Sequence, residues 1–285
     1  MNKQFETGLM WFRRDLRVTD NTALCMALQA CRLVYCVFVF DQDILAALPR
    51  ADRRVEFIRA SLCALDEDLR QLSGTPGAGL IVRQGLAVEE IVALAKELQV
   101  QAVFAARDYE PQAQARDARV LDDLAQAGMA LHTCKDHVVF EGRDILTQTG
   151  TPYGVFTPYK NNWLATVTPQ HLRGHEAAPF ATALAPRPVA LQQPVPPLAA
   201  IGFEKTNLAA LKIPTGASGG RQLFEDFFER MDSYHETRDF PAVKGPSYLS
   251  VHLRFGTVSI RQLAATALQR QIQGSRGAAV WLGEL

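Results

Sequence analysis

The chain is 285 residues long, enough for one large domain or two ordinary ones. Hydrophobic residues make up 48% of it and charged residues 21%, which is the profile of a globular protein with a sizeable core. Lysine plus arginine and aspartate plus glutamate number 30 each, so the net charge does not indicate a nucleic-acid partner, although it leaves room for a local basic patch.

The cysteines and the apolar runs indicate the cellular setting. The five cysteines form no CxxC pair and lie in apolar segments, which is typical of free thiols in a reducing compartment. No stretch approaches the roughly 18 apolar residues of a membrane span, and the first residues lack the apolar run of a signal peptide. We therefore expect a cytoplasmic protein without a membrane partner. His171 and His175 have the spacing of a metal pair, but no HExxH motif contains them and no metal site is predicted.

Strand and helix patterns alternate over residues 1–135. Short apolar runs predict five buried parallel strands, at Gly8–Phe12, Leu33–Phe40, Gly79–Arg83, Ala102–Ala105 and Ala130–Thr133. Apolar residues at helical spacing predict helices over Val55–Leu72, Val88–Leu98 and Ala113–Ala127. The alternation predicts a doubly wound α/β sheet.

The loop after the first strand reads WFRRDLRVTDNTAL and contains no GxGxxG motif, which argues against an NAD site. It places Arg13, Arg14, Asp15 and Arg17 at the carboxyl end of a strand, where doubly wound sheets bind ligands. These side chains could equally pair with one another and hold the loop in place. The sequence leaves both interpretations open.

A proline-rich connector separates the α/β part from a helical part. Residues 176–200 contain six prolines and few charges, which favours a semi-rigid linker. The stretch FTPYKNNW, at 156–163, is expected to be a loop that packs between domains. Further on, the apolar residues of 223–231 predict one helix, and another is expected to start near Ser259, with Thr257 or Ser259 as its cap.

The segment from Tyr234 to Ser250 is predicted to be a long loop, because Pro241, Gly245 and Pro246 interrupt any regular element. The two serines Ser247 and Ser250 could contact a phosphate, or they could simply cap the next helix. From 234 to 276 there are six basic and two acidic residues, a net charge of +4. Such a segment suits contact with a phosphate backbone, and it is equally compatible with a solvated basic face.

Four stretches, in this order, resemble the DNA photolyase and cryptochrome family. WFRRDLRVTDNTAL is similar to the family's opening strand and loop, and VFTPYKNNW to its segment between the domains. YHETRDFPAVKGPSYLSVHLRFGTVSIRQ resembles the flavin-phosphate region, and AVWLGEL the start of the helix that lines the substrate cavity. The resemblance runs from Gly8 to Leu285 and is nearest to photolyases that act on cyclobutane pyrimidine dimers.

The resemblance implies an α/β antenna domain at 1–135, a connector at 136–200, and the start of an all-α FAD- and DNA-binding domain at 201–285. It also implies an enzyme, a monomer in its full-length form, that splits pyrimidine dimers in DNA with light. Reduced FAD would donate an electron to a dimer flipped out of the duplex. Two alternatives stay open: a cryptochrome-like photoreceptor without repair activity, or an inactive fragment that retains only the α/β binding domain.

The resemblance assigns roles to individual residues. Those expected to contact FAD are Tyr234, Ser247, Tyr248, Leu249, Ser250 and Trp281. Arg238 and Glu284 are expected to contact DNA, and Glu284 and Trp281 are the expected catalytic residues. A carboxyl group at Glu284, protonated in a water-poor cavity, could donate a hydrogen bond to a thymine carbonyl.

The chain departs from the family pattern at three places. Pro246 replaces a threonine, which removes a hydroxyl and a backbone donor from the phosphate segment. Gln112 and Ala113 stand where folate-using members have Asn-Glu, so methenyltetrahydrofolate is disfavoured while another second chromophore stays open. The family's helical domain also continues beyond its W-x-x-E. We therefore expect a truncated chain that exposes an apolar patch around Trp281 and 223–231 and by itself binds FAD weakly or not at all.

Overall fold

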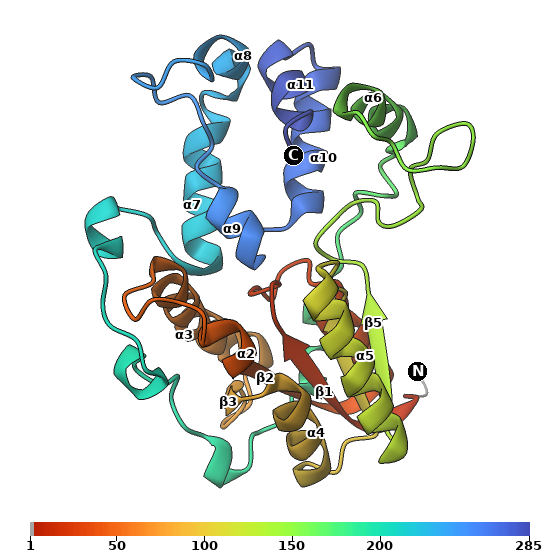
Figure 1. Cartoon of the computed structure of the whole chain (residues 1–285), viewed down its shortest axis with the longest axis vertical. Helices are drawn as coiled ribbons and strands as arrows, with labels where there is room; N and C mark the ends of the chain where they lie inside the picture. Colours follow the sequence, from red (N-terminus) through yellow and green to blue (C-terminus); the bar gives the residue numbers. More distant parts are fainter. Residues whose placement is uncertain (1–2) are drawn as a thin grey trace.

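The computed structural model describes residues 3–285, and its first half is built on a five-stranded parallel sheet (Figure 1). The strands follow one another across the sheet in the order β3-β2-β1-β4-β5. They are β1 (Phe5–Phe12), β2 (Cys31–Asp41), β3 (Leu80–Gly85), β4 (Ala102–Ala106) and β5 (Ala130–Cys134). All five predicted strands are confirmed, because apolar runs of this length can be buried on both faces of a parallel sheet.

Helices cover both faces of this sheet, which confirms the doubly wound class (Figure 1). One core combines strand residues with α1 (Thr22–Ala30) and α3 (Arg53–Ser73). The opposite core combines them with α4 (Ala87–Glu97) and α5 (Pro111–Gln126). The short helix α2 (Gln42–Leu45) follows β2. Residues 3–135 are called the α/β half from here on.

The proline-rich connector packs along the α/β half. Leu184 forms an isolated parallel bridge with Val34 of β2, and Arg187 donates a hydrogen bond of 2.9 Å to the carbonyl of Leu80. The connector and the residues that follow form four short 3-10 helices: η1 (Ala178–Ala183), η2 (Val189–Leu191), η3 (Leu198–Ile201) and η4 (Leu208–Leu211). Prolines suit this path because it lies outside long helices and strands, where the missing N–H of a proline would interrupt a ladder of hydrogen bonds.

The loop predicted at 156–163 is wrong, because these residues belong to helix α6 (Phe156–Thr166). Pro158 is the third residue of this helix, and in the first turn the missing N–H of a proline would have no intrahelical partner. Trp163 lies edge-on to Phe140, with ring centroids 5.6 Å apart. The helix is therefore stabilised by a tertiary contact that its local sequence does not reveal.

Residues 201–285, called the helical half, carry the predicted helices at 223–231 and after Ser259. The elements are α7 (Gly216–Phe228), η5 (Met231–Ser233), α8 (Tyr234–Thr237), α9 (Ser250–Phe255), α10 (Ile260–Ile272) and α11 (Arg276–Leu282). The side chain of Ser259 caps α10 by accepting a hydrogen bond from the backbone N–H of Gln262 at 3.4 Å, as predicted. None of the helices described from residue 3 onward is long and apolar enough to cross a membrane.

The expected exposed apolar patch is wrong. Trp281 is only 3% exposed, and its indole lies against the rings of Phe224 and Phe227, at centroid distances of 5.9 and 4.7 Å. Phe227 and Met231 are completely buried. The apolar faces of α7, α10 and α11 cover one another, so this part of the chain forms a core of its own.

Candidate functional site

Three of the predicted site residues meet where α8 approaches α11. The guanidinium of Arg238 lies 2.5 Å from the carboxylate of Glu284, atom to atom. The same guanidinium lies 5.8 Å from the ring centroid of Tyr234, which in turn packs edge-on against Phe227 at 5.7 Å. Residues 46 positions apart in the sequence thus form one surface cluster, here called the α8–α11 cluster: Tyr234, Arg238 and Glu284.

The electrostatics of the α8–α11 cluster differ from the expected water-poor cavity. Glu284 is exposed to solvent and accepts a hydrogen bond from Arg238, which raises the pKa of that guanidinium. Partial burial raises the pKa of the Tyr234 phenol, and the carboxylate of Glu284 adds to the effect. The expectation of a carboxyl group shielded from water is therefore wrong for Glu284 in this structure, where it forms a surface ion pair.

The predicted phosphate segment forms a tight turn before α9. The hydroxyl of Ser247 accepts a hydrogen bond from the backbone N–H of Leu249 at 3.5 Å, and Leu249 itself is fully buried. Tyr248 is half exposed and has a φ of +58°, the left-handed region. Ser250 is exposed at the first position of α9. Two hydroxyl groups and one phenol are thus accessible, while Leu249 anchors the turn in the core.

Trp281 does not lie on the accessible surface with the other predicted FAD contacts. Phe224 and Phe227, both of α7, cover its indole, as described above. A ligand would therefore have to displace Phe224 or approach only the edge of the indole. In this structure Trp281 is part of the core beneath the α8–α11 cluster, and its indole does not form the wall of a cavity.

A second group of polar residues surrounds a cavity of about 710 Å³ at the carboxyl edge of the sheet. It lies at the ends of β1, β2 and β4, where the strand order reverses and doubly wound sheets bind ligands. Phe12, Phe38 and Phe40 contribute apolar wall, and α9 closes the mouth with Arg254 and Phe255. The volume falls within the range of ordinary small-molecule sites.

Two arginines flank the indole of Trp11 in this cavity. The guanidinium carbons of Arg13 and Arg116 lie 4.6 and 5.1 Å from its ring centroid. Nη1 of Arg13 donates to both carboxylate oxygens of Asp117, at 2.5 and 2.6 Å. Arg116 pairs with the same carboxylate at 3.1 Å, so Asp117 holds both arginines at the wall of the cavity. The loop sequence had indicated these arginines, but not the Trp11 platform or the closing helix α9.

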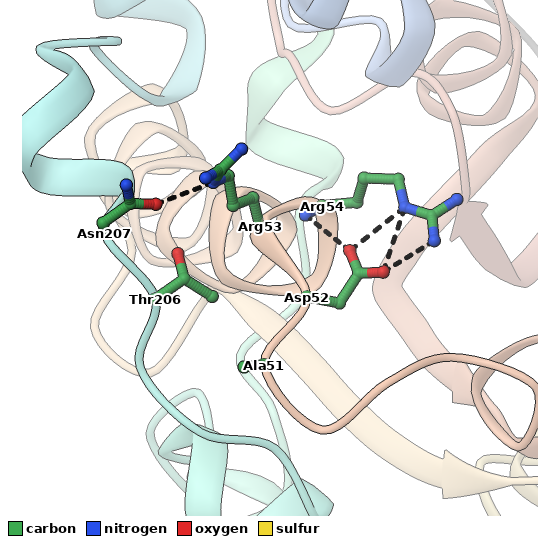
Figure 2. Close-up of a pocket in the computed structure, with 6 residues that line it drawn as sticks. All are labelled: Ala51, Asp52, Arg53, Arg54, Thr206 and Asn207. Atoms are coloured by element: carbon green, nitrogen blue, oxygen red, sulfur yellow. Dashed lines mark hydrogen bonds and ion pairs between the residues drawn. The ribbon is translucent and has the colours of Figure 1, made fainter.

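A smaller hollow of about 470 Å³ lies at the start of α3 (Figure 2). Its polar groups bind one another: Arg53 donates to the side chain of Asn207 at 2.7 Å, and Asp52 holds Arg54 at 2.6 Å. The hydroxyl of Thr206 donates a hydrogen bond to the carboxylate of Glu56. This hollow is therefore an attachment of the chain after the connector to α3, and the cavity at the sheet edge is the better candidate ligand site.

The fold is shared with solved structures of a cryptochrome and a photolyase. A cryptochrome of Synechocystis sp. superimposes with a TM-score of 0.82 and 20% identity, over 100% of this chain and 60% of that chain. An archaeal photolyase from Sulfolobus tokodaii, solved with two FAD molecules, superimposes with a TM-score of 0.66 and 23% identity, over 97% and 57%. At these identities the likeness is one of fold alone.

Sequence comparison identifies the family. The family model described as DNA photolyase matches residues 8–182 of the chain. The deoxyribodipyrimidine photo-lyase of Synechococcus sp. is 32% identical over 289 residues, which cover 97% of this chain and 58% of that protein. The chain therefore belongs to the DNA photolyase family, and it spans somewhat more than half the length of that relative.

Proposed function

We propose that the protein containing this chain splits cyclobutane pyrimidine dimers in DNA with light, using FAD. The observation that carries the proposal is the α8–α11 cluster, in which a tyrosine, an arginine and a glutamate from distant parts of the sequence lie together. Membership of a family that includes a deoxyribodipyrimidine photo-lyase supports it. The whole protein's activity, its DNA substrate and its monomeric state are all parts of the proposal.

In this proposal FAD supplies the light-driven electron, and the chain supplies contacts. The hydroxyls of Ser247 and Ser250 are accessible on one turn and fit a pyrophosphate, with the backbone beside Tyr248 and the buried Leu249 holding that turn in place. Tyr234 would contact the flavin from α8, and Trp281 would support it from behind.

Arg238 would contact a DNA phosphate, and Glu284 would accept or donate a hydrogen bond to the dimer. Because the two side chains are paired in the structure, DNA binding requires that a phosphate replace Glu284 as the partner of Arg238. The exposed position of the pair makes this exchange inexpensive, since surface ion pairs stabilise a protein by only about 0–1 kcal/mol. Glu284 would then be free to meet the dimer.

We further propose that the cavity at the sheet edge holds a second, light-harvesting chromophore. Trp11 offers a face for stacking, and Arg13, Arg116 and the exposed Arg119 offer charge to an anionic group. A planar aromatic molecule with a phosphate or carboxylate fits this combination. Methenyltetrahydrofolate stays disfavoured, because Ala113, at the position expected to bind a pterin, lines this cavity without a polar side chain.

The decisive test is a repair assay on the full-length protein with an oligonucleotide that contains one thymine dimer. We expect blue light to restore the undamaged bases, and we expect Glu284→Ala to lower the repair yield per photon more than it lowers the FAD content. Repair that is unchanged in this variant would overturn the role of Glu284. A protein that binds FAD but repairs nothing under light would support a photoreceptor instead, and a colourless protein would support a fragment without catalysis.

The proposed setting is the cytoplasm. All five cysteines are free thiols, and three of them, at 25, 31 and 36, are buried. Burial raises the pKa of Cys31 to about 11, so its thiol stays protonated and unreactive at neutral pH. A reducing compartment is where such thiols persist.

A further inference from the structure

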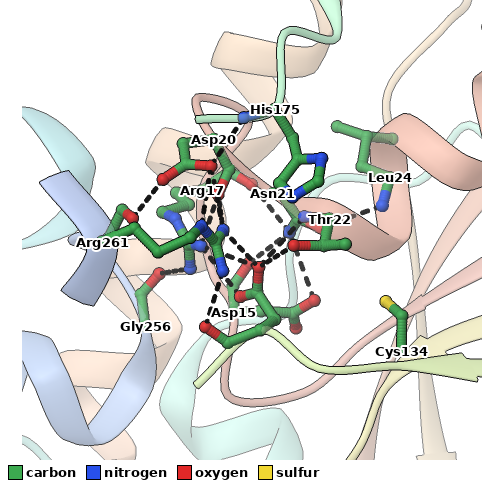
Figure 3. Close-up of polar contacts among 12 residues, drawn as sticks. Asp15, Arg17, Asp20, Asn21, Thr22, Leu24, Cys134, His175, Gly256 and Arg261 are labelled. Carbon is green, nitrogen blue, oxygen red and sulfur yellow. Dashed lines mark hydrogen bonds and ion pairs between the residues drawn. The ribbon is translucent and has the colours of Figure 1, made fainter. Parts of the chain in front are cut away.

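Four buried charged residues join the α/β half to the helical half (Figure 3). They come from three parts of the chain: the loop after β1, the second residue after β5, and the first turn of α10. We call them the interdomain clamp: Arg17, Asp20, Asp136 and Arg261. Their exposed fractions are 3%, 8%, 1% and 5%, so none of the four charges is stabilised by bulk water.

Arg261 holds both carboxylates at once. Its Nη2 donates to Oδ1 of Asp20 and to Oδ1 of Asp136, each at 2.9 Å. The same Nη2 also lies 2.8 Å from the backbone carbonyl of Asp20, while Nε donates to Oδ1 of Asp20 and Nη1 to the backbone carbonyl of Asp136, each at 3.1 Å. A planar fork with several donors can satisfy two separate acids in this way, whereas a lysine ammonium could not match both. The first turn of α10 is therefore tied to the loop after β1, through Asp20, and to the start of the connector, through Asp136.

Arg17 completes the clamp from the other side. Its Nη2 lies 2.8 Å from Oδ2 of Asp136, and its Nη1 donates to the carbonyl of Gly256, between α9 and α10, at 3.1 Å. Burial by itself would raise the pKa of Asp136, but Arg17 and Arg261 outweigh it and hold that pKa well below its ordinary value. Asp136 thus stays charged, and each of the two carboxylates of the clamp has an arginine partner.

The backbone beside the clamp is fitted closely as well. The N–H of Leu16 donates to the carbonyl of Phe255 at 3.1 Å. Gly256 has a φ of +63°, and a Cβ there would lie 1.9 Å from the carbonyl oxygen of Arg14. Any other residue at 256 would push the two halves apart.

A second attachment lies elsewhere, between α3 and α7. The N–H of Gly216 donates to the hydroxyl of Ser61 at 3.1 Å, and a Cβ at 216 would meet the side chain of Ala64 at 2.7 Å. One attachment leaves a helical body free to rotate about it, but two separated attachments do not. In Figure 1, α7 stands over α3, and α10 stands beside α7, above the sheet edge.

We propose that Arg261 is a positioning residue that sets the orientation of α10, and with it of α11 and Glu284, relative to the cavity at the sheet edge. The inference rests on the proposed function in one respect, namely that FAD binds beside the α8–α11 cluster and a second chromophore binds in the cavity at the sheet edge. Energy transfer between two chromophores depends steeply on their separation and relative orientation, so a fixed angle between the halves has a functional consequence. The sequence left open whether the charged motif RRDLRVTDN binds a ligand or holds its own loop in place. In this inference its residues Arg17 and Asp20 join the two halves.

The test measures the geometry of the chain itself. Spin labels at Gln126→Cys and Gln273→Cys, exposed positions on the two halves, report the distance between them by pulsed electron spin resonance, with Cys63 and Cys134 replaced by serine. We expect one narrow distance distribution for the parent, and a distribution at least twice as wide for Arg261→Met. Exchange of the Leu16 amide with deuterium should become at least tenfold faster. Gln262→Met, an exposed change on the same turn, is the matched control and should alter neither.

The outcomes separate the inference from the proposed function. An unchanged distance distribution and unchanged Leu16 protection in Arg261→Met would overturn the inference, whatever the repair assay gives. Loss of dimer repair in the parent protein would overturn the proposed function and leave the clamp result standing. If Arg261→Met does not fold, Arg261→Lys decides, because it keeps the charge but loses the fork: a broadened distribution supports the inference and a narrow one overturns it.

Discussion

The two halves of the molecule present their candidate ligand groups in different ways. In the α/β half, Arg13 and Arg116 flank Trp11 within a cavity whose walls come from several strands and helices. In the helical half, Arg238 and Glu284 lie at the surface, and each is the other's ion-pair partner. Arg13 and Arg116 are themselves paired with Asp117, but they lie in a cavity that is already formed before a ligand enters it. A ligand of the second half has to compete with a contact that the chain makes with itself.

This contrast predicts that ligand binding at the two sites depends differently on salt concentration. Enclosed charges are screened little by salt, whereas an exposed ion pair loses much of its energy within a Debye length of about 8–10 Å. Binding in the α/β cavity should therefore tolerate salt, and DNA binding at the α8–α11 cluster should not.

The largest effect is expected for the core of the helical half. Phe227→Ala removes a fully buried ring that contacts Tyr234 and Trp281, and should lower the free energy of unfolding by about 3–5 kcal/mol. Phe240→Ala, at a ring that is 61% exposed, is the control and should change it little. Urea denaturation followed by circular dichroism measures both. A loss below about 1 kcal/mol for Phe227→Ala would show that the helical half has no well-packed core.

The junction of the halves should be sensitive to acid. His252 of α9 is fully buried, edge-on to Phe57 of α3 at 5.2 Å, and burial lowers its pKa to about 4. In the unfolded chain it takes up a proton near pH 6.5, so the stability it contributes is complete above that pH and is lost as the pH falls towards 4. Between pH 7 and 5 the loss should be about 2 kcal/mol.

The variant His252→Gln tests this assignment. Its absolute stability will be lower, but the change in its unfolding free energy between pH 7 and 5 should be about 2 kcal/mol smaller than that of the parent. Equal pH dependence in the two proteins would mean that His252 is not the acid-sensitive group.

A moderate effect is expected at the start of α11, the helix that carries Trp281. The side chain of Ser275 caps this helix by accepting a hydrogen bond from the N–H of Ala278 at 3.1 Å. Ser275→Ala should cost about 1 kcal/mol of unfolding free energy, and Ser275→Thr should restore most of it. Thermal unfolding of the three proteins measures the difference, and equal midpoints would contradict the role of this cap.

The smallest effect is expected for an exposed ion pair between the halves. Arg254 of α9 lies 2.7 Å from Glu110, and both side chains are more than half exposed. Arg254→Ala should therefore cost less than about 1 kcal/mol, and 1 M salt should abolish the difference from the parent. A larger and salt-independent loss would show that this surface pair, and not the buried clamp alone, joins the halves.

The sequence predicted the α/β half more completely than the helical half. Buried parallel strands such as 33–40 are continuous apolar runs, and amphipathic helices such as α3 repeat at a fixed spacing, so local sequence indicates both. Helix α1 is not predicted, because it has only nine residues and is apolar on most sides, so it lacks a clear helical pattern. Helix α6 was predicted as a loop, because its aromatic and amide residues gain their order from contacts such as that of Trp163 with Phe140.

The candidate site shows the same division. The motifs indicated Tyr234, Arg238 and Glu284 one by one, but neither the ion pair between Arg238 and Glu284 nor the burial of Trp281 follows from them. The roles of these residues in binding FAD and DNA stay predictions, as do the boundaries 1–135, 136–200 and 201–285. The cavity at the sheet edge combines side chains from strands that are far apart in sequence, and no local pattern announces it.

The sequence by itself determined the five strands, the long amphipathic helices of the α/β half and the family, because apolar periodicity and short motifs act over a few residues. Only the tertiary structure decided which charges meet. Arg261 pairs with Asp20 across 241 positions and with Asp136 across 125. Whether an arginine in such a chain binds a ligand, a phosphate or another loop depends on which acid the fold brings within about 3 Å of it, and that is set by the packing of helices on the sheet.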